Sequence, residues 1–184
     1  MRIGIISDTH GSVEAWEKAL NSVFQEVDMI LHAGDVLYHG ARNPLPAGYG
    51  TVQLAEALNA CPIPLVIVQG NCDSDVDQMV IDIPMQAPFA LLEAPWGRIL
   101  LTHGHRYAPD EALILAEKYR VRLWVSGHTH VPVMEKTNNT IFFNPGSPSL
   151  PKGDDPRPTV GLITEGMVKL IALDSGATLM ELKL

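Results

Sequence analysis

The sequence predicts an α/β fold in which two β-sheets pack face to face with helices on the outside. In the first two-thirds of the chain, short apolar runs alternate with helical stripes, as expected of β-α-β units. From Val131 onward the pattern changes to successive short strands without helices, which predicts a β meander. No linker and no internal repeat divides the 184 residues. We therefore expect a single domain over residues 1–184, a length that is ample for a buried core.

The N-terminal elements alternate between strand and helix. The Ile-rich run from Met1 to Ser7 predicts a buried strand, and Ser12 is a suitable N-cap for the helix that follows. Met29 to Ala33 predicts a second short apolar strand. The stretch from Val36 to Gly50 contains several prolines and glycines and has no periodicity, so it predicts a loop. At about 15 residues it exceeds the usual connection, and loops of this length often serve function.

The later elements follow from similar signals. Residues 52–58 predict a helix that ends before Pro62, and residues 65–68 predict the third strand. A hairpin is expected from residues 89–93 and 98–102, with its turn at Pro95 to Gly97. The helix expected at residues 109–119 begins with Pro at its first turn. The remaining strands are expected at residues 122–125, 133–136, 141–143, 159–164, 168–173 and 178–182.

Composition restricts the class of partner. The formal net charge is −8, and no Lys/Arg cluster is longer than a pair. This argues against extended nucleic acids, which need many phosphate contacts from basic side chains. No apolar stretch approaches the roughly 20 residues of a membrane-spanning helix, so no membrane association is expected. Cys61 and Cys72 provide no disulfide framework, which favours a cytoplasmic location.

Seven side chains capable of binding a metal lie in five short motifs, and each motif follows an apolar, strand-like run. Carboxylate, amide and imidazole groups together suit hard or borderline divalent ions. In open α/β sheets, ligands bind beyond the carboxyl ends of strands, where all five motifs are expected. The recurrence of this placement is the strongest indication of a metal centre. The seven residues are Asp8, His10, Asp35, Asn71, His103, His128 and His130.

Each motif also has a simpler explanation when taken alone. Asp8 is compatible with a turn that caps the first helix. Asp35, after Gly34, suits an Asx turn. The pair His128 and His130 is compatible with two accidental surface histidines. Only the five motifs together make the metal interpretation the preferred one.

Several neighbouring residues have roles that the motifs leave open. His32 is expected to be a buried, hydrogen-bonded histidine, and Cys72 a small packed side chain. His105 is compatible with support of the ligands, with proton donation or with a surface position. Arg42 and Arg106 are candidates for contact with a non-bridging phosphate oxygen. The alternative for each arginine is a solvated surface residue.

The motifs resemble those of the calcineurin-like metallophosphoesterase superfamily, whose pattern reads D-x-H, G-D, G-N-H-D/E, H and G-H-x-H. The match runs in order over residues 3–130, and the segment NPGSPS at 144–149 is similar to its small bacterial and archaeal phosphodiesterase branch. The resemblance implies a four-layer sandwich built on two mixed β-sheets. It also implies two divalent ions, with Mn favoured and Fe, Co, Ni or Zn compatible with the ligands. By resemblance one ion takes Asp8, His10, Asp35 and His130, and the other takes Asp35, Asn71, His103 and His128.

The function implied is hydrolysis of small phosphodiesters by in-line attack of a metal-bridging hydroxide. Asp35 and Asn71 would take part in catalysis as ligands, with His105 as a candidate third residue. The superfamily usually has His where this chain has Cys72, so the identity of the leaving-group acid stays open. Asp73, which would orient that His, loses its usual partner.

Two other functions remain as alternatives, a phosphomonoesterase and a non-catalytic scaffold that binds proteins. A scaffold can lose metal ligands, whereas all seven are present in this chain, so the sequence favours an enzyme. The strand-rich ending leaves sheet edges that favour a homo-oligomer.

Overall fold

Seven strands form the larger of two β-sheets in the computed structural model, which describes residues 1–184. Its strand order is β12-β11-β10-β1-β2-β3-β4. β1 to β4 run parallel to one another, whereas β10 pairs with β1 in the antiparallel sense. The strands are β1 (Ile3–Ile6), β2 (Met29–His32), β3 (Leu65–Val68), β4 (Met85–Gln86), β10 (Thr159–Thr164), β11 (Met167–Ala172) and β12 (Thr178–Lys183).

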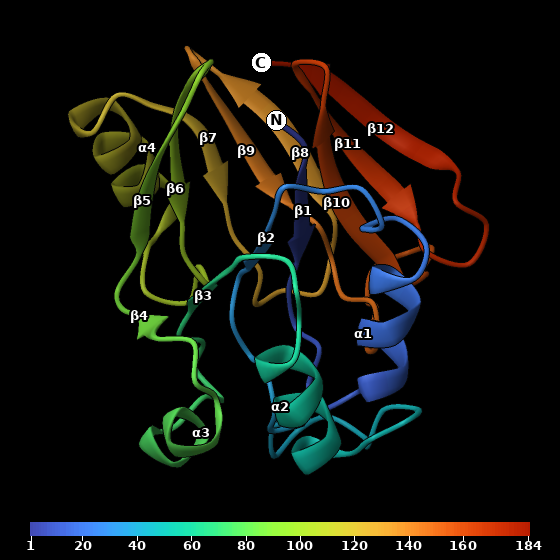
Figure 1. Cartoon of the computed structure of the whole chain (residues 1–184). Helices are drawn as coiled ribbons and strands as arrows, with labels where there is room; N and C mark the ends of the chain where they lie inside the picture. Colours follow the sequence, from blue (N-terminus) through green and yellow to red (C-terminus); the bar gives the residue numbers. More distant parts are fainter.

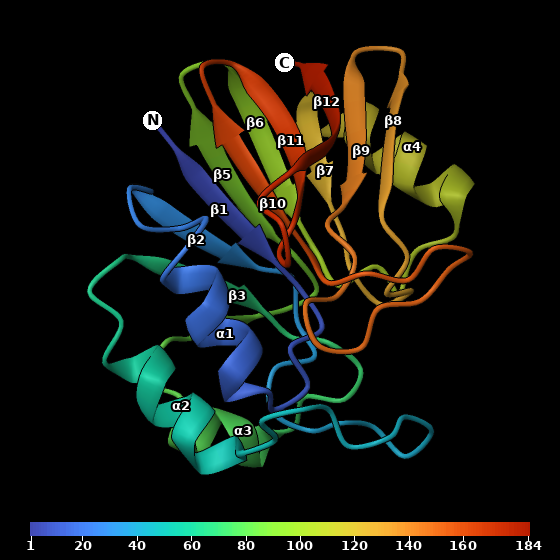
Figure 2. The ribbon, with the colours of Figure 1, turned by 90° about the vertical axis from the view of Figure 1, so that its right-hand side faces the viewer.

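The second sheet has five strands in the order β5-β6-β7-β9-β8. β6, β7 and β9 are parallel, and antiparallel hairpins with β5 and β8 close its two sides. Both sheets are therefore mixed, and they pack face to face as predicted (Figure 2). The strands are β5 (Ala90–Ala94), β6 (Gly97–Leu101), β7 (Val121–Val125), β8 (Val133–Thr137) and β9 (Thr140–Asn144).

Helices cover the outer faces of both sheets. α1 (Val13–Leu20) and α2 (Thr51–Asn59) pack on the first sheet, and α4 (Pro109–Lys118) packs on the second (Figure 1). The short α3 (Asp75–Val80) lies at the same end of the molecule as α2 (Figures 1 and 2). The four layers confirm the predicted fold class. No helix has the length and apolar character needed to cross a lipid bilayer.

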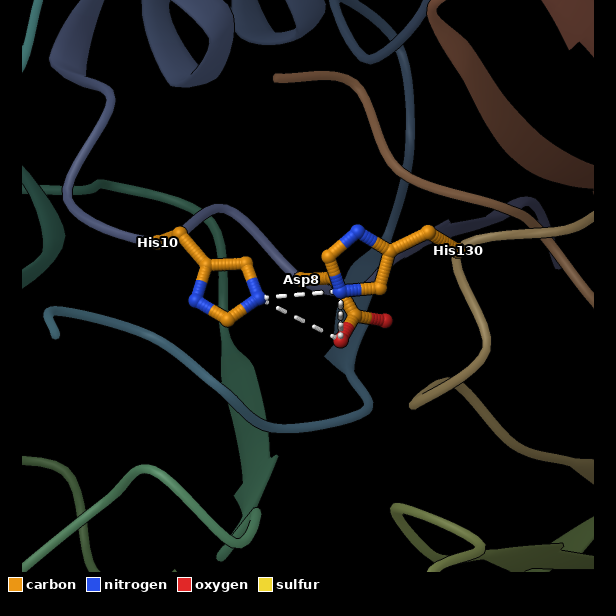
Figure 3. A group of neighbouring side chains, drawn as sticks. All are labelled: Asp8, His10 and His130. Atoms are coloured by element: carbon orange, nitrogen blue, oxygen red, sulfur yellow. Dashed lines mark hydrogen bonds and ion pairs between the residues drawn. The ribbon is translucent and has the colours of Figure 1, made fainter. Parts of the chain in front are cut away.

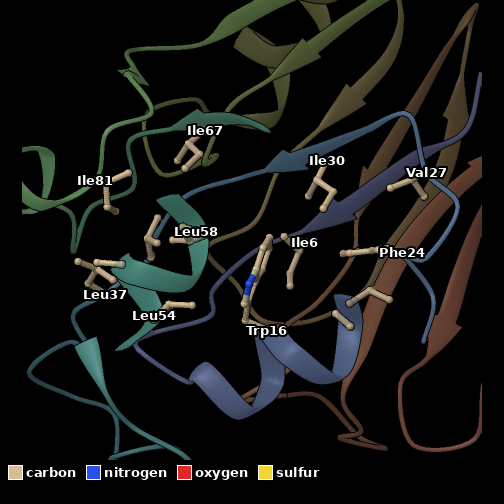
Figure 4. Close-up of a cluster of buried hydrophobic side chains, with 14 of the residues drawn as sticks. Ile6, Trp16, Phe24, Val27, Ile30, Leu37, Leu54, Leu58, Ile67 and Ile81 are labelled. Carbon is tan, nitrogen blue, oxygen red and sulfur yellow. The ribbon is translucent and has the colours of Figure 1, made fainter. Parts of the chain in front are cut away.

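Three apolar cores separate the four layers. Trp16, from α1, lies in the core between the helices and the first sheet, where Ile6 and Leu54 surround it (Figure 4). The core between the sheets contains Ile5 and Phe143, and the third core lies beneath α4. Successive residues of a strand point to opposite faces, so both faces of β1 are buried. This explains why β1 reads as a continuous apolar run rather than an alternating one.

Two features differ from the sequence-based expectation. The final strands do not form one meander, because β8 and β9 join the second sheet while β10 to β12 return to the first. Apolar patterning specifies a buried strand but not its partner, so it did not predict this separation. α3 and β4 were also missed. No residue of α3 is buried, so it has no apolar stripe to mark it, and its start is held by the Ser74 N–H, which donates to Asp77 Oδ2 at 2.8 Å.

Candidate metal centre

The five motifs converge where parallel strands of the two sheets end. Asp8 and His10 follow β1, Asp35 follows β2, and Asn71 follows β3. His103 follows β6 of the second sheet, and the pair His128 and His130 follows β7. Contacts between these side chains join all three motifs of the first sheet to both motifs of the second. The structure therefore brings together all seven residues that the sequence singled out.

Asp8, His10 and His130 form one tight group (Figure 3). The Nε2 atoms of the two histidines lie 3.1 Å apart. Asp8 Oδ1 lies 3.4 Å from Nε2 of His130 and 3.7 Å from Nε2 of His10. All three side chains are buried. Three atoms that can bind a metal thus point at one small, buried volume.

The hydrogen bonds around this group show that it suits a cation. Nδ1 of His10 and Nδ1 of His130 each lie 2.7 Å from a backbone carbonyl oxygen, of Tyr38 and Leu150 respectively. A carbonyl only accepts, so each Nδ1 carries its proton and each Nε2 is left with a lone pair directed at the other. Asp8 Oδ2 accepts from Ser7 Oγ, yet Oδ1 is buried without any hydrogen-bond partner. One metal cation would satisfy all three atoms, which a single proton does not.

The pKa shifts of His10 and Asp8 show that this group favours a positive charge beside an ionised carboxylate. Burial lowers the pKa of His10, but the Asp8 carboxylate and the Tyr38 carbonyl raise it by more, and the net shift is upward. Burial likewise raises the pKa of Asp8, whereas His10 and the charges of His103 and His130 lower it, and the net shift is downward. The carboxylate therefore stays ionised inside the protein.

Asp35 connects this group to a second one. Its Oδ2 lies 3.7 Å from His10 Nε2, and its Oδ1 lies 3.3 Å from His103 Nε2. His103 Nε2 is also 3.0 Å from Oδ1 of Asn71, while its Nδ1 faces the carbonyl oxygen of Ala33 at 2.7 Å. Although burial raises the pKa of Asp35, the hydrogen bond and charge of His103 lower it well below its usual range. One carboxylate thus presents a separate oxygen to each group.

The second group is more open than the first. The ring of His128 lies 5.2 Å from that of His103, centroid to centroid, and both His128 and Asn71 are exposed to solvent. The backbone N–H of His128 donates to Asp8 Oδ2 at 3.0 Å, which joins the β7 motif to the β1 motif. A ligand from solvent therefore reaches the second group first.

Backbone conformation at the motifs is unusual. Five of the seven residues have a positive φ: 55° at Asp8, 47° at His10, 56° at Asp35, 71° at His128 and 60° at His130. Non-glycine residues adopt this left-handed region at a cost of order 1–3 kcal/mol each, and such strain clusters at functional sites. The surrounding fold therefore stabilises a ligand geometry that the local sequence disfavours.

Two glycines allow the motif loops to approach one another. A Cβ atom on Gly127 would lie 1.8 Å from Ser7 Oγ and 2.6 Å from Asp8 Oδ2. A Cβ atom on Gly70 would lie 2.2 Å from Asp35 Oδ1. Real Cβ atoms do not come this close, so the glycines of the G-H-x-H and G-N motifs are required by space.

Asp73 and Cys72 support Asp35 from behind. The carboxylate of Asp73 accepts the backbone N–H groups of Asp35 at 2.8 Å, Val36 at 2.7 Å and Gly70 at 2.7 Å. Burial raises the pKa of Asp73 to about 6, so it is ionised at neutral pH. The Cys72 N–H donates to Asp35 Oδ1 at 2.8 Å. Burial and then the Asp35 charge raise the pKa of the Cys72 thiol to about 12, so the thiol is neutral in the metal-free protein beside His10 and Asp35.

The remaining predicted residues differ in their relation to the site. His105 is half-buried, with its ring 5.3 Å from that of His103, and burial followed by the His103 charge lowers its pKa to about 4. It is therefore a neutral ring at pH 7. His32 is buried and lies 3.0 Å from Thr9 Oγ1, as expected of a structural histidine. Arg42 lines the cleft over the metal centre, whereas Arg106 is exposed and does not line it.

The cleft itself has a volume of about 590 Å³ and a largely polar lining. Asp35, Asn71 and His128 form its floor, together with His130 and Cys72. Sequence analysis missed Tyr38, Asn43 and Lys152, which also line it. Tyr38 and Asn43 lie in the loop already suspected of serving function, but Lys152 lies in a Pro/Gly-containing segment with no ligand motif. A slightly smaller, apolar hollow of about 540 Å³ lies beyond Tyr38, between α2 and α3, and contains none of the seven residues.

Comparison with known proteins agrees with this geometry. The family model for the calcineurin-like phosphoesterase superfamily domain matches residues 1–166. The chain belongs to this superfamily. It is 39% identical over 175 residues to the phosphodiesterase YfcE of Escherichia coli K12, covering 95% of this chain and 93% of the relative. It is 32% identical over 161 residues to a probable metallophosphoesterase of Methanothermobacter thermautotrophicus, covering 85% and 82%.

Solved structures extend the comparison. The structure of the E. coli YfcE phosphoesterase matches with a TM-score of 0.89 and 35% identity, covering 100% of this chain and 99% of the other. Vps29 of Entamoeba histolytica, solved with zinc, matches with a TM-score of 0.68 and 20% identity, covering 100% and 99%. The second likeness shows the fold alone. The prediction of a metal-dependent phosphoesterase is thus confirmed at the level of the family.

Proposed function

We propose that the chain is a phosphodiesterase that uses two divalent metal ions and acts on small phosphodiesters. The observation that carries this proposal is the placement of Asp35, whose two oxygens face two different groups of nitrogen and oxygen donors. A carboxylate in this position suits a bridge between two ions. The 39% identity to a protein named as a phosphodiesterase supports the same reaction class.

The ligand sets follow from the contacts. One ion would take Asp8, His10, Asp35 and His130. The other would take Asp35, Asn71, His103 and His128. Donors of carboxylate, amide and imidazole type admit Mn, Fe, Co, Ni or Zn, and we favour Mn. When bound, the two ions would supply Lewis-acid stabilisation of the phosphate oxygens and a hydroxide at neutral pH.

The charge of the site favours a diester over a monoester. Two divalent ions bring four positive charges, and the Asp8 and Asp35 carboxylates offset two of them. An attacking hydroxide would offset a third, and the five remaining ligand residues, four histidines and Asn71, would be neutral when they bind metal. One residual positive charge matches the single negative charge of a phosphodiester, whereas a phosphomonoester dianion exceeds it.

The protein's own groups provide orientation and access. His128 and Asn71 lie on the open side of the centre, so the ester approaches over them from the cleft. Arg42 lines that cleft and would contact a non-bridging phosphate oxygen. With a thiol pKa of about 12, Cys72 is a poor proton donor, so we expect the best substrates to have leaving groups that need little protonation. His105 is the remaining candidate to donate a hydrogen bond, from a neutral ring.

The test compares bis(p-nitrophenyl) phosphate with p-nitrophenyl phosphate, using protein stripped of metal and then loaded with Mn. We expect hydrolysis of the diester to require the metal and to exceed hydrolysis of the monoester. Asp35→Asn removes one of the two ionised oxygens and should lower kcat/KM by at least about 100-fold. Preference for the monoester would favour the phosphomonoesterase alternative, and a lack of hydrolysis of both esters would favour a scaffold.

A further inference from the structure

Two cations line the cleft without an acidic partner. Arg42 and Lys152 both contribute to its wall. The side-chain ion pairs formed by arginine and lysine in this chain involve other residues, namely Arg2, Arg98, Arg157 and Lys169. Both cations thus line the cleft that lies over the proposed metal ligands. Their charge is available to a ligand.

Lys152 is held over the metal centre by contacts on two sides. Its backbone N–H donates to the carbonyl oxygen of His130 at 3.1 Å. Its Nζ donates to Oδ1 of Asn43 at 3.2 Å, which connects the loop after β9 to the loop after β2. The amide of Asn43 is oriented for this contact, because its Nδ2 donates to the His39 carbonyl oxygen at 2.9 Å. An ammonium has three N–H groups, so a neutral partner that takes one leaves two for a ligand.

The charge of Lys152 acts on the metal centre. Burial is the main cause of the lowered pKa of His130, and the positive charge of Lys152 lowers it further. His128, on the open side, is affected in the same direction. Lys152 lines the same cleft as both histidines, and its backbone contacts that of His130, so it is near enough to act on a substrate that contacts them.

We propose that Lys152 forms a second anion-binding subsite beside the metal centre, next to the Arg42 that would contact the scissile phosphate, and that the preferred substrate is a phosphodiester with an additional anionic group. This inference rests on the proposed function. The metal centre with its own ligands already balances the single charge of a diester. Two more cations over the same cleft leave positive charge that a carboxylate or phosphate on one of the two alcohol groups would neutralise.

The experiment uses two esters that differ only in this charge, p-nitrophenyl 4-carboxybutyl phosphate and p-nitrophenyl pentyl phosphate. Both release p-nitrophenol, so the chemistry of the leaving group is the same. We expect the Mn-loaded wild type to have a higher kcat/KM for the carboxylate ester. Lys152→Met should lower the ratio of the two kcat/KM values about fivefold, since a partly solvated ion pair is screened. Lys152→Glu should lower it further.

Lys136→Met is the matched control, because it removes the same charge from β8 near the turn of the β8–β9 hairpin (Figure 2), and Lys136 does not line the cleft. An equal fall of the ratio in Lys136→Met would show an effect of net charge and overturn the proposal. An equal loss for both esters in Lys152→Met would also overturn it, because the lysine would then contact the scissile phosphate. If the wild type hydrolyses neither ester, the proposed function fails as well. If the wild type hydrolyses both esters with nearly equal kcat/KM, only the proposal of a second subsite is overturned.

Discussion

His10 and His130 place their Nε2 atoms 3.1 Å apart, while the Nδ1 atom of each ring lies 2.7 Å from a backbone carbonyl oxygen. Two lone pairs this close repel unless a positive charge lies between or beside them. A proton or a bound metal cation removes this repulsion, and only the metal cation also satisfies Asp8 Oδ1, so metal binding should affect stability as well as activity.

The first prediction is that chelation destabilises the fold. A ligand that binds only the native state stabilises it, so removing the metal with EDTA should lower the Tm by about 5–10 °C. Differential scanning calorimetry on Mn-loaded and stripped protein measures this shift. In His130→Asn, which lacks one donor of the group, the shift should shrink. His39→Asn, outside the seven residues, should keep the full shift; equal shifts in both variants would refute the assignment.

The second prediction concerns pH in the metal-free protein. Burial lowers the pKa of His103, but the Asp35 carboxylate raises it by more, to about 9, compared with 6.5 in an unfolded chain. A raised histidine pKa stabilises the fold fully below pH 6.5, and this contribution is lost as the pH rises through 9. The free energy of unfolding should therefore fall by about 2 kcal/mol over this window, as followed by urea titration.

Between pH 6.5 and 9 the metal-loaded protein should show a different pH dependence from the stripped protein. Metal binding requires neutral imidazoles, so the affinity for Mn should increase as the pH rises. His103→Gln removes the titrating group and should flatten the pH dependence of the stripped protein. A stripped wild type whose stability is constant from pH 6.5 to 9 would contradict the raised pKa.

The third prediction concerns the contact between the β7 and β1 motifs. Gly127→Ala places a Cβ atom against Ser7 Oγ and Asp8 Oδ2, both in a buried region. We expect a loss of stability of about 3 kcal/mol or more, together with weaker metal binding. Gly50→Ala is the control, because its Cβ would meet only the flexible end of Gln53. Chemical denaturation measures the free energy of unfolding of both variants. Similar losses of stability would show that the close approach of the β1 motif to Gly127 is unimportant.

The fourth prediction assigns Asp73 a positioning role. Asp73→Asn keeps the size of the side chain but replaces one accepting oxygen by an NH₂ group, which faces a backbone N–H. The loop that carries Asp35 should loosen at a cost of about 2 kcal/mol. Calorimetric titration with Mn should show weaker binding, with kcat at saturating metal changed less than the affinity. Asp75→Asn, at the exposed start of α3, should bind Mn like the wild type.

The sequence predicted most of the parts that hold the site. The parallel strands β1, β2 and β3 are short and lie inside a layered fold, so each appears in the sequence as a run of apolar residues. The residues that follow them include Asp8, Asp35 and Asn71. The pairing of β10 with β1 was not predictable. Apolar side chains show that a strand is buried, but they do not show which other strand pairs with its edge. α3 was missed because a helix without buried residues carries no periodic signal.

The geometry of the side chains in the site could not be predicted from the sequence. The two-sided contacts of the Asp35 carboxylate depend on loops whose φ angles the sequence disfavours, such as the 56° of Asp35 itself. Lys152 illustrates a second limit, because its position comes from the return of the chain after β9 and from a contact with Asn43. Long-range connections of this kind leave no local pattern.

The antiparallel pairing of β1 with β10 joins the first strand of the chain to one that begins at Thr159. Ser147 reaches the same region, where its Oγ donates to the carbonyl oxygen of Asp8 at 2.8 Å. During synthesis, β1 therefore has no β10 to pair with until Thr159–Thr164 has been made. Such distant pairing slows folding. Before that point the chain lacks the antiparallel neighbour of the strand that is followed by Asp8 and His10.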